Sequence, residues 1–126
     1  MKIIMMLSLV ICFISAAHAA QGNAVYYDPP YTKSACYGNH DNGQMNTGVS
    51  DELWDGGRAC GRSYKVQCVR AANLAPHPCH DGASVTVKVV DYCAKPCDGV
   101  LNLAKDAFAV IADTKAGNVV VDYTPV

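Results

Sequence analysis

The chain has 126 residues, of which 10 are basic and 11 acidic, and its formal net charge is −1. This length suits one domain with a single core. The basic residues form no block, so the sequence lacks the positive surface by which proteins bind nucleic acids or anionic membranes.

The N-terminal residues have the composition of a secretory signal peptide. Lys2 is the only charged residue before an apolar run from Ile3 to Ile14, and the small-residue cleavage pattern Ala17-His18-Ala19 follows. The run is shorter than the roughly 20 apolar residues of a membrane-spanning helix. We therefore predict a signal peptide at residues 1–19 and an exported domain at residues 20–126, without membrane insertion.

The first part of this domain predicts one strand, a long loop and a helical turn. Residues 22–28 (GNAVYYD) have the β-branched and aromatic content of a strand, which two prolines then end. Residues 31–48 are rich in Gly, Asn and Thr and predict a surface loop. Residues 50–57 (SDELWDGG) predict one helical turn, with Ser50 able to cap its N-terminus.

The second part predicts three more strands and a helix. Residues 63–69 and 84–93 alternate apolar and polar positions, and a proline-containing loop at 73–82 separates them. Residues 104–112 predict a helix because apolar residues recur on one face, and residues 118–126 predict a final strand. Five or six short strands with one helix describe a small closed β-barrel, which leaves no exposed sheet edge.

The cysteines indicate disulfides. Of seven, Cys12 belongs to the signal peptide, and an even number in a small exported chain indicates three bridges. Six cysteines allow 15 connectivities. Short intervening loops favour the pairs Cys68–Cys79 and Cys93–Cys97, and this choice leaves Cys36–Cys60.

A zinc site is the alternative interpretation of the same residues. His77, Cys79 and His80 lie close together in HPCHD, and Cys93 and Cys97 are four positions apart. In an oxidising compartment the thiols pair first, and no second pair at zinc-finger spacing accompanies them. We therefore predict no metal site, and no cofactor.

Several segments resemble a known family. SACYGN, GVSDELWDGGRACGRSYKVQC, VTVKVVDYC and LNLAKDAFAVIA occur in the order of the expansin-like double-psi barrel domain. The sequence is most similar to the single-domain branch called plant natriuretic peptides, also described as endoglucanase-like domain proteins. This resemblance covers essentially all of residues 20–126.

The resemblance implies a mainly β fold: a six-stranded double-psi β-barrel with one or two short helices and a shallow open groove. It also supports pairing Cys36 with Cys60, as in related expansins and barwins. Ser63 stands where expansins have a further cysteine, so a fourth bridge is absent. The second, carbohydrate-binding domain of expansins is not expected, because the sequence ends at Val126.

The resemblance also places the candidate site. Inverting glycosidases need an acid and a base about 6.5–9.5 Å apart. Aligning VLNLAKDAF with the expansin pattern HFDLSxxAF puts Asn102 at the position of the acid in family forty-five endoglucanases, and an amide has no titratable proton to deliver. Asp91 matches the other polar groove position and is either a ligand contact or a brace for the loop after its strand. Asn102 is alternatively a turn residue. We predict no catalytic residue and no enzyme.

The aromatic residues divide into two groups. Tyr26 and Tyr64 lie in predicted strands and are expected to face the core. Exposed aromatic rings can stack on sugar faces, so the remaining candidates are assigned to the groove: Tyr27, Tyr31, Tyr37 and Trp54.

Two classes of function are consistent with this sequence. The first, implied by the resemblance to plant natriuretic peptides, is a secreted apoplastic signal in water and solute balance that acts through a cell-surface receptor. In that branch, activity is associated with the N-terminal half, which corresponds here to residues 28–62. The resemblance therefore implies these candidate partner-binding residues: Tyr31, Lys33, Tyr37, Trp54, Arg58 and Arg62. The second is a module that binds or loosens cell-wall polysaccharide, or a residual glycan-active enzyme. We expect a monomer.

Overall fold

The computed structural model describes residues 19–126, and the predicted signal peptide lies, apart from Ala19, outside the described residues. The structure has six strands. They are β1 (Ala20–Tyr27), β2 (Asn46–Val49), β3 (Ser63–Ala71), β4 (Val85–Tyr92), β5 (Leu101–Ala104) and β6 (Val119–Pro125). The helical segments are α1 (Asp51–Trp54), the 3₁₀ turn η1 (Asp55–Gly57), α2 (Lys105–Ile111) and the 3₁₀ turn η2 (Thr114–Ala116). Within residues 19–126, no helix is both long and apolar enough to cross a bilayer.

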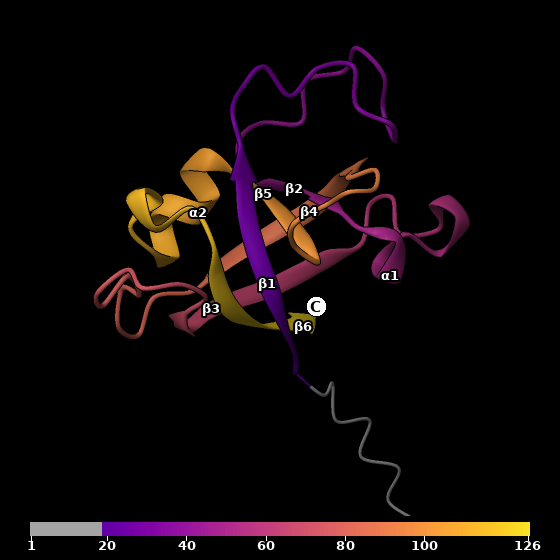
Figure 1. Cartoon of the computed structure of the whole chain (residues 1–126). Coiled ribbons are helices and arrows are strands. Elements are labelled where there is room, and N and C mark those ends of the chain that lie inside the picture. The colour runs from indigo at the N-terminus through magenta and orange to yellow at the C-terminus, as the bar shows by residue number, and fades with distance from the viewer. Residues whose placement is uncertain (1–18) are drawn as a thin grey trace, which may run out of the picture.

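The strands close into one barrel in the order β1-β5-β2-β4-β3-β6 (Figure 1). β1 pairs with β5 in parallel, and β2 pairs with β4 in parallel. The other four pairings are antiparallel. The predicted fold class, a six-stranded barrel with short helices, is confirmed.

Two of the strands were not located from the sequence. β2 begins inside the stretch predicted as a loop, residues 31–48, so that prediction is wrong for residues 46–48. β5 lies where the sequence suggested a turn beside the helix. Both strands have four residues, and each is held between two neighbouring strands. A strand this short has almost no pattern of its own, because its stability comes from cross-strand contacts.

The core lies inside the barrel and under α2. Leu101, Leu103 and Val89 are fully buried within it, as are Phe108 and Ile111 of the helix. Helix α2 packs against β1, β4 and β5 on one side of the barrel (Figure 1). Tyr64 is buried as predicted, whereas Tyr26 is half-buried and packs on Phe108 with ring centroids 5.0 Å apart.

Three disulfides fasten the loops, with the connectivity predicted from loop length. Cys36–Cys60 ties the long loop between β1 and β2 to the segment after η1. Cys68–Cys79 ties β3 to the loop before β4, and Cys93–Cys97 closes the short loop after β4.

Candidate functional site

The register of four neighbouring strands places four residues in a line across the outer face of the barrel. Asn102 of β5 is paired with Val25 of β1 on one side and with Gly48 of β2 on the other, and Gly48 is paired with Asp91 of β4. We call Val25, Asn102, Gly48 and Asp91 the central row. Asn102 points outward, because Leu101 and Leu103 on either side of it are fully buried. Adjacent strands are about 4.8 Å apart, so the Cα atoms of Asn102 and Asp91 are separated by about 10 Å.

A β-bulge brings Asp91 to this face. Val85, Val87 and Val89 point into the core, and strict alternation would send Asp91 the same way. The register with β2 shifts between Thr47 and Gly48: Thr47 is paired with Val89, and Gly48 is paired with Asp91. Val90 is therefore left without a partner on β2. A bulge of one extra residue re-aims the side chains that follow it. The alternation predicted over residues 84–93 therefore does not continue to the end of the strand.

The Asp91 carboxylate braces a loop. Its Oδ1 accepts hydrogen bonds from the backbone N–H groups of Ala35 and Tyr92, both at 2.9 Å. Ala35 belongs to the loop between β1 and β2, so this contact fixes that loop beside the central row. Oδ2 accepts no hydrogen bond from a residue within 19–126. The two roles weighed for Asp91 are thus compatible, since one oxygen holds the loop and the other is left for a ligand.

Tyr27 lies beside the central row, but its hydroxyl is already engaged. The phenol donates to Oδ1 of Asn46 at 2.6 Å, and Nδ2 of Asn46 donates to the Gly43 carbonyl at 2.6 Å. Burial raises the pKa of Tyr27 far above its ordinary value, and the nearby Asp91 carboxylate raises it further. Tyr27 is therefore a protonated donor to Asn46 and offers only its ring to a ligand.

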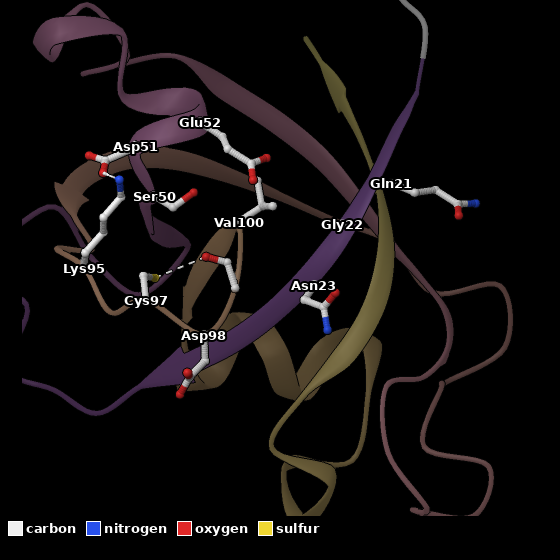
Figure 2. Close-up of a pocket in the computed structure, with 11 residues that line it drawn as sticks. Gln21, Gly22, Asn23, Ser50, Asp51, Glu52, Lys95, Cys97, Asp98 and Val100 are labelled. Carbon is white, nitrogen blue, oxygen red and sulfur yellow. Dashed lines mark hydrogen bonds and ion pairs between the residues drawn. The ribbon is translucent and has the colours of Figure 1, made fainter.

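Two hollows flank the central row, one toward each end of the strands β1 and β2. The first hollow has a cavity volume of about 460 Å³ (Figure 2). Its walls come from β1, from the segment after β2 and from the loop before β5: Gln21, Gly22, Asn23, Ser50, Asp51, Glu52, Lys95, Cys97, Asp98, Gly99 and Val100. The second hollow, of about 250 Å³, lies beyond the other ends of β1 and β2 and is lined by Pro29, Pro30, Tyr31, Thr32, Asp41, Gly43 and Gln44. We call the row and the two hollows together the groove face.

Charged groups gather in the first hollow. Lys95 Nζ lies 3.3 Å from Oδ2 of Asp51, and the Tyr92 hydroxyl donates to Oδ1 of the same carboxylate. The hydrogen bond from Tyr92, with the neighbouring Lys95, lowers the pKa of Asp51. Glu52 and Asp98 have no ion-pair partner within the described residues.

The sequence predicted that the Ser50 side chain could cap α1, but it does not. It is the N-cap residue by position, but its side chain makes no capping hydrogen bond. Its hydroxyl is enclosed and has no hydrogen-bond partner among residues 19–126. Figure 2 shows Ser50 in the wall of the first hollow, between Asp51 and Val100.

The predicted partner-binding residues are only partly on the surface. Tyr31 is 9% exposed, and its hydroxyl bridges the Tyr27 carbonyl and the Lys105 amide, so its assignment as an exposed contact is wrong. Trp54 is half-buried and packs on Tyr92 with centroids 5.0 Å apart, which gives it a structural role.

The remaining members of that set are half-buried or exposed. Tyr37 is half-buried beneath Lys88, whose Nζ lies 4.6 Å from the ring centroid. Lys33 is exposed. Arg58 and Arg62 are exposed and share the Asp55 carboxylate, at 3.2 and 2.8 Å.

The zinc interpretation has no cluster to support it. Cys79, Cys93 and Cys97 are in disulfides, and His80 contacts the Val110 carbonyl through Nδ1 at 3.2 Å. Residues 19–126 contain no group of three or more His, Cys, Asp or Glu side chains arranged to hold a metal.

Sequence reasoning identified Asp91, Asn102 and Tyr27 but not the residues between and beyond them. It missed Gly48, Asn46 and the whole first hollow. The alternation of Leu101, Asn102 and Leu103 covers only three positions, which is too few to distinguish a strand from a turn beside the helix. No local pattern marks the first hollow, because it is assembled from three segments that are far apart along the chain.

Comparison with known proteins identifies the family. An EG45-like domain containing protein 2 from Arabidopsis thaliana is 56% identical over 110 residues, which are 87% of this chain and 83% of that protein. An EG45-like domain containing protein from Citrus jambhiri is 40% identical, over 97% of this chain and 94% of the relative. The chain belongs to the EG45-like domain family. A family model described as lytic transglycolase also matches this EG45-like chain over residues 46–123.

The EG45-like domain is also similar to a solved expansin. An Asp-to-Asn variant of Clavibacter michiganensis expansin in complex with cellohexaose superposes with a TM-score of 0.67 at 25% identity. The match covers 86% of this chain and 50% of the expansin, so the chain spans about half the length of that protein. The resemblance to expansins inferred from the sequence is confirmed, and the fold is a double-psi β-barrel.

Proposed function

We propose that this protein is a secreted, non-catalytic, expansin-like module that binds an extended polysaccharide along its groove face. The observation that carries the proposal is the alignment of the first hollow, the central row and the second hollow along the same strands. Such a surface fits a linear chain better than a compact ligand. The expansin with the same fold that was solved with cellohexaose supports this choice of ligand.

Secretion rests on two features of the sequence. The predicted signal peptide gives the route of export, and three disulfides in a small domain suit an oxidising compartment. The relatives from Arabidopsis and Citrus support a plant setting, in which the extracellular space is the apoplast.

The absence of catalysis rests on the side chains of the central row. Cleavage of a glycosidic bond requires an acid that protonates the leaving oxygen, a contribution worth about 10²–10⁴ in rate. Asn102 has no proton to deliver. Asp91 uses Oδ1 to hold Ala35 and Tyr92 in place, so moving this carboxylate toward a scissile bond would release the loop.

Binding is tested by sedimentation with insoluble cellulose and wall polysaccharides, and by calorimetry with cellohexaose. Asp91→Asn keeps the shape and one acceptor oxygen but loses the charge, so we expect about ten-fold weaker binding at an unchanged melting temperature. Thr86→Val, an equally conservative change on the outer face of β4 outside the groove, is the control. Wild-type protein that stays in the supernatant with every insoluble glycan and shows no heat of binding with cellohexaose would refute the proposal.

Catalysis is tested on the same preparations. Wild-type protein should release no reducing ends from cellulose, xylan, mixed-linkage glucan or peptidoglycan above a heat-killed control. Asn102→Asp restores a carboxylate, yet we expect little activity, because the base and the sugar contacts must also be closely positioned. Clear cleavage by the wild type would overturn the non-catalytic proposal.

A second candidate is the extracellular signal in water and solute balance that acts through a cell-surface partner. It is favoured by Arg58 and Arg62, which share Asp55 on a loop that Cys36–Cys60 fastens, since exposed Arg anchors held by a rigid loop are typical of binding hot spots.

A cell-swelling assay tests this candidate. Arg58→Ala should abolish the response without a change in the far-UV circular dichroism spectrum, whereas Lys115→Ala, an exposed change outside the loop, should not. Trp54→Ala is expected to lower stability as well, because this ring packs on Tyr92. Full activity of Arg58→Ala would exclude this surface as the contact.

A further inference from the structure

The first hollow is lined by carboxylates that outnumber its cations. Asp51, Glu52 and Asp98 contribute acidic groups, and Lys95 is the one basic residue in its wall. Lys95 is already paired with Asp51 at 3.3 Å. Glu52 and Asp98 are exposed and have no ion pair within residues 19–126, so the hollow presents a net negative wall to solvent.

The hollow adjoins the central row on three strands at once. Asn23 precedes Val25 of the row by two residues in β1, Val100 precedes Asn102 by two, and Ser50 follows Gly48 by two. At about 3.3 Å of rise per residue, the hollow begins about 7 Å from the row. A linear ligand that lies over Asn102 and extends in this direction therefore passes the carboxylates.

A carboxylate on that ligand would meet a wall of net negative charge. The wall holds no unpaired cation to compensate it, because the Lys95 ammonium is engaged by Asp51. Like charges placed together suppress binding of the wrong partner, and a concave wall of one sign strengthens the field inside it. A neutral sugar avoids this repulsion, and its hydroxyl groups can donate hydrogen bonds to the same carboxylates.

We propose that the first hollow makes the groove selective for glycans without carboxylates, and that Glu52 and Asp98 set this selectivity. The inference rests on the proposed function, because it concerns the polysaccharide that the groove binds. It excludes uronate polymers as ligands of this face and favours neutral glucans.

The experiment compares two ligands with the same backbone. One is cellohexaose, and the other is cellohexaose whose hydroxymethyl groups have been oxidised to carboxylates. In calorimetry at low ionic strength, wild-type protein should bind the neutral ligand at least about ten-fold more tightly. Salt at about 0.5 M should bring the ratio of the two affinities closer to one, because the charges lie in an open hollow and are screened.

The decisive variant is Glu52→Gln combined with Asp98→Asn, which removes two charges and keeps the side-chain shapes. We expect the ratio of the two affinities to fall toward one in this variant, because the repulsion of the oxidised ligand is removed while each amide keeps one acceptor oxygen for a sugar hydroxyl. The control combines Asp81→Asn with Asp106→Asn, two exposed residues outside the first hollow, and removes the same charge. The control should keep the wild-type ratio, because the effect is local.

The outcomes separate this inference from the proposed function. If wild-type protein binds both ligands equally, or if the double variant keeps the wild-type ratio, the selectivity inference is wrong while glycan binding stands. If the control variant narrows the ratio as much as the double variant does, net charge and not the hollow is responsible, and the inference again fails. If neither ligand binds to any variant, the proposed function itself fails.

Discussion

The barrel has two unlike halves. β3 and β6 pair antiparallel over a long stretch, from Tyr64 opposite Pro125 to Ala71 opposite Val119, with one shift near Cys68. β2 and β5 have four residues each, and the pairings around them mix parallel and antiparallel neighbours. The groove face lies on this second, irregular part of the barrel, on β2 and β5 and on the strands β1 and β4 that flank them.

The difference separates the strands that form a regular framework from those that carry the groove face. Long antiparallel strands make many ladder contacts between two segments, so they form a framework that tolerates changes on its outer face. In the short strands β2 and β5, each residue is paired with residues that are far away in the sequence. This arrangement places Asn102 beside Gly48 and Gly48 beside Asp91, although more than 40 positions separate Gly48 from either partner. Residues from several segments can then face one ligand.

The largest expected effect tests whether the irregular half depends on its own core. Leu103 of β5 is fully buried, and Leu103→Ala should reduce the free energy of unfolding by about 2–5 kcal/mol in urea denaturation. Because β5 joins β1 to β2, glycan affinity of the folded protein should fall as well. Val66→Ala in β3 should lower stability without that loss of affinity. Equal effects of both variants on affinity would contradict a division between the halves.

We expect the disulfide Cys36–Cys60 to contribute more to stability and the disulfide Cys93–Cys97 to contribute more to glycan affinity. Loop-closure entropy assigns about 3.5 kcal/mol to Cys36–Cys60 and about 2 kcal/mol to Cys93–Cys97, since their sequence separations are 24 and 4. Replacing each pair by alanines and measuring the denaturation midpoint should reproduce this order. Glycan affinity should be more sensitive to Cys93–Cys97, because its loop carries Lys95 of the first hollow. An unchanged affinity would show that the first hollow does not contact the ligand.

A smaller effect concerns pH. Burial raises the pKa of Tyr27 in the folded state, whereas an unfolded tyrosine titrates near 10. As pH rises through about 10, the unfolded chain loses this proton first, so it binds fewer protons than the folded chain and stability falls. Below that pH the contribution is fully present.

Urea denaturation at a series of pH values from neutral upward measures this loss. Tyr27→Phe should make the free energy of unfolding depend less on pH in the alkaline range. It should also lower the free energy of unfolding by about 1–2 kcal/mol near neutrality, because the side-chain oxygen of buried Asn46 loses its hydrogen-bond donor. Some pH dependence should persist, since the hydrogen bond to Asp51 raises the pKa of Tyr92 and burial raises that of Tyr123. An identical alkaline slope in Tyr27→Phe would contradict this assignment.

The smallest effect is expected at Arg58. Its side chain is 78% exposed, and its partner Asp55 is also bonded to Arg62. An exposed pair contributes little, since solvent screens it and the long side chain loses freedom when it is held. Arg58→Ala should leave the melting temperature unchanged within error, and glycan binding as well. A clear loss of stability would show that this loop supports the framework.

The sequence by itself determined the strands that have a pattern of their own. β3, β4 and β6 are long enough for alternation to be visible, and the helix has its apolar face. The cysteine spacing predicted the three bridges, because short loops restrict which thiols can meet. The absence of a titratable proton at Asn102 is a property of the residue and needs no structure.

Only the tertiary structure decided how these parts face one another. β2 and β5 are too short to show a period, and their positions follow from the strands on either side. The bulge at Val90 turns Asp91 outward against the alternation of its own strand. Tyr31 lies in a stretch rich in Gly, Asn and Thr that predicted a surface loop, yet it is buried, because Tyr27 and α2 enclose it. A local pattern reports only the period along one segment, whereas these features depend on pairings between segments far apart in the chain.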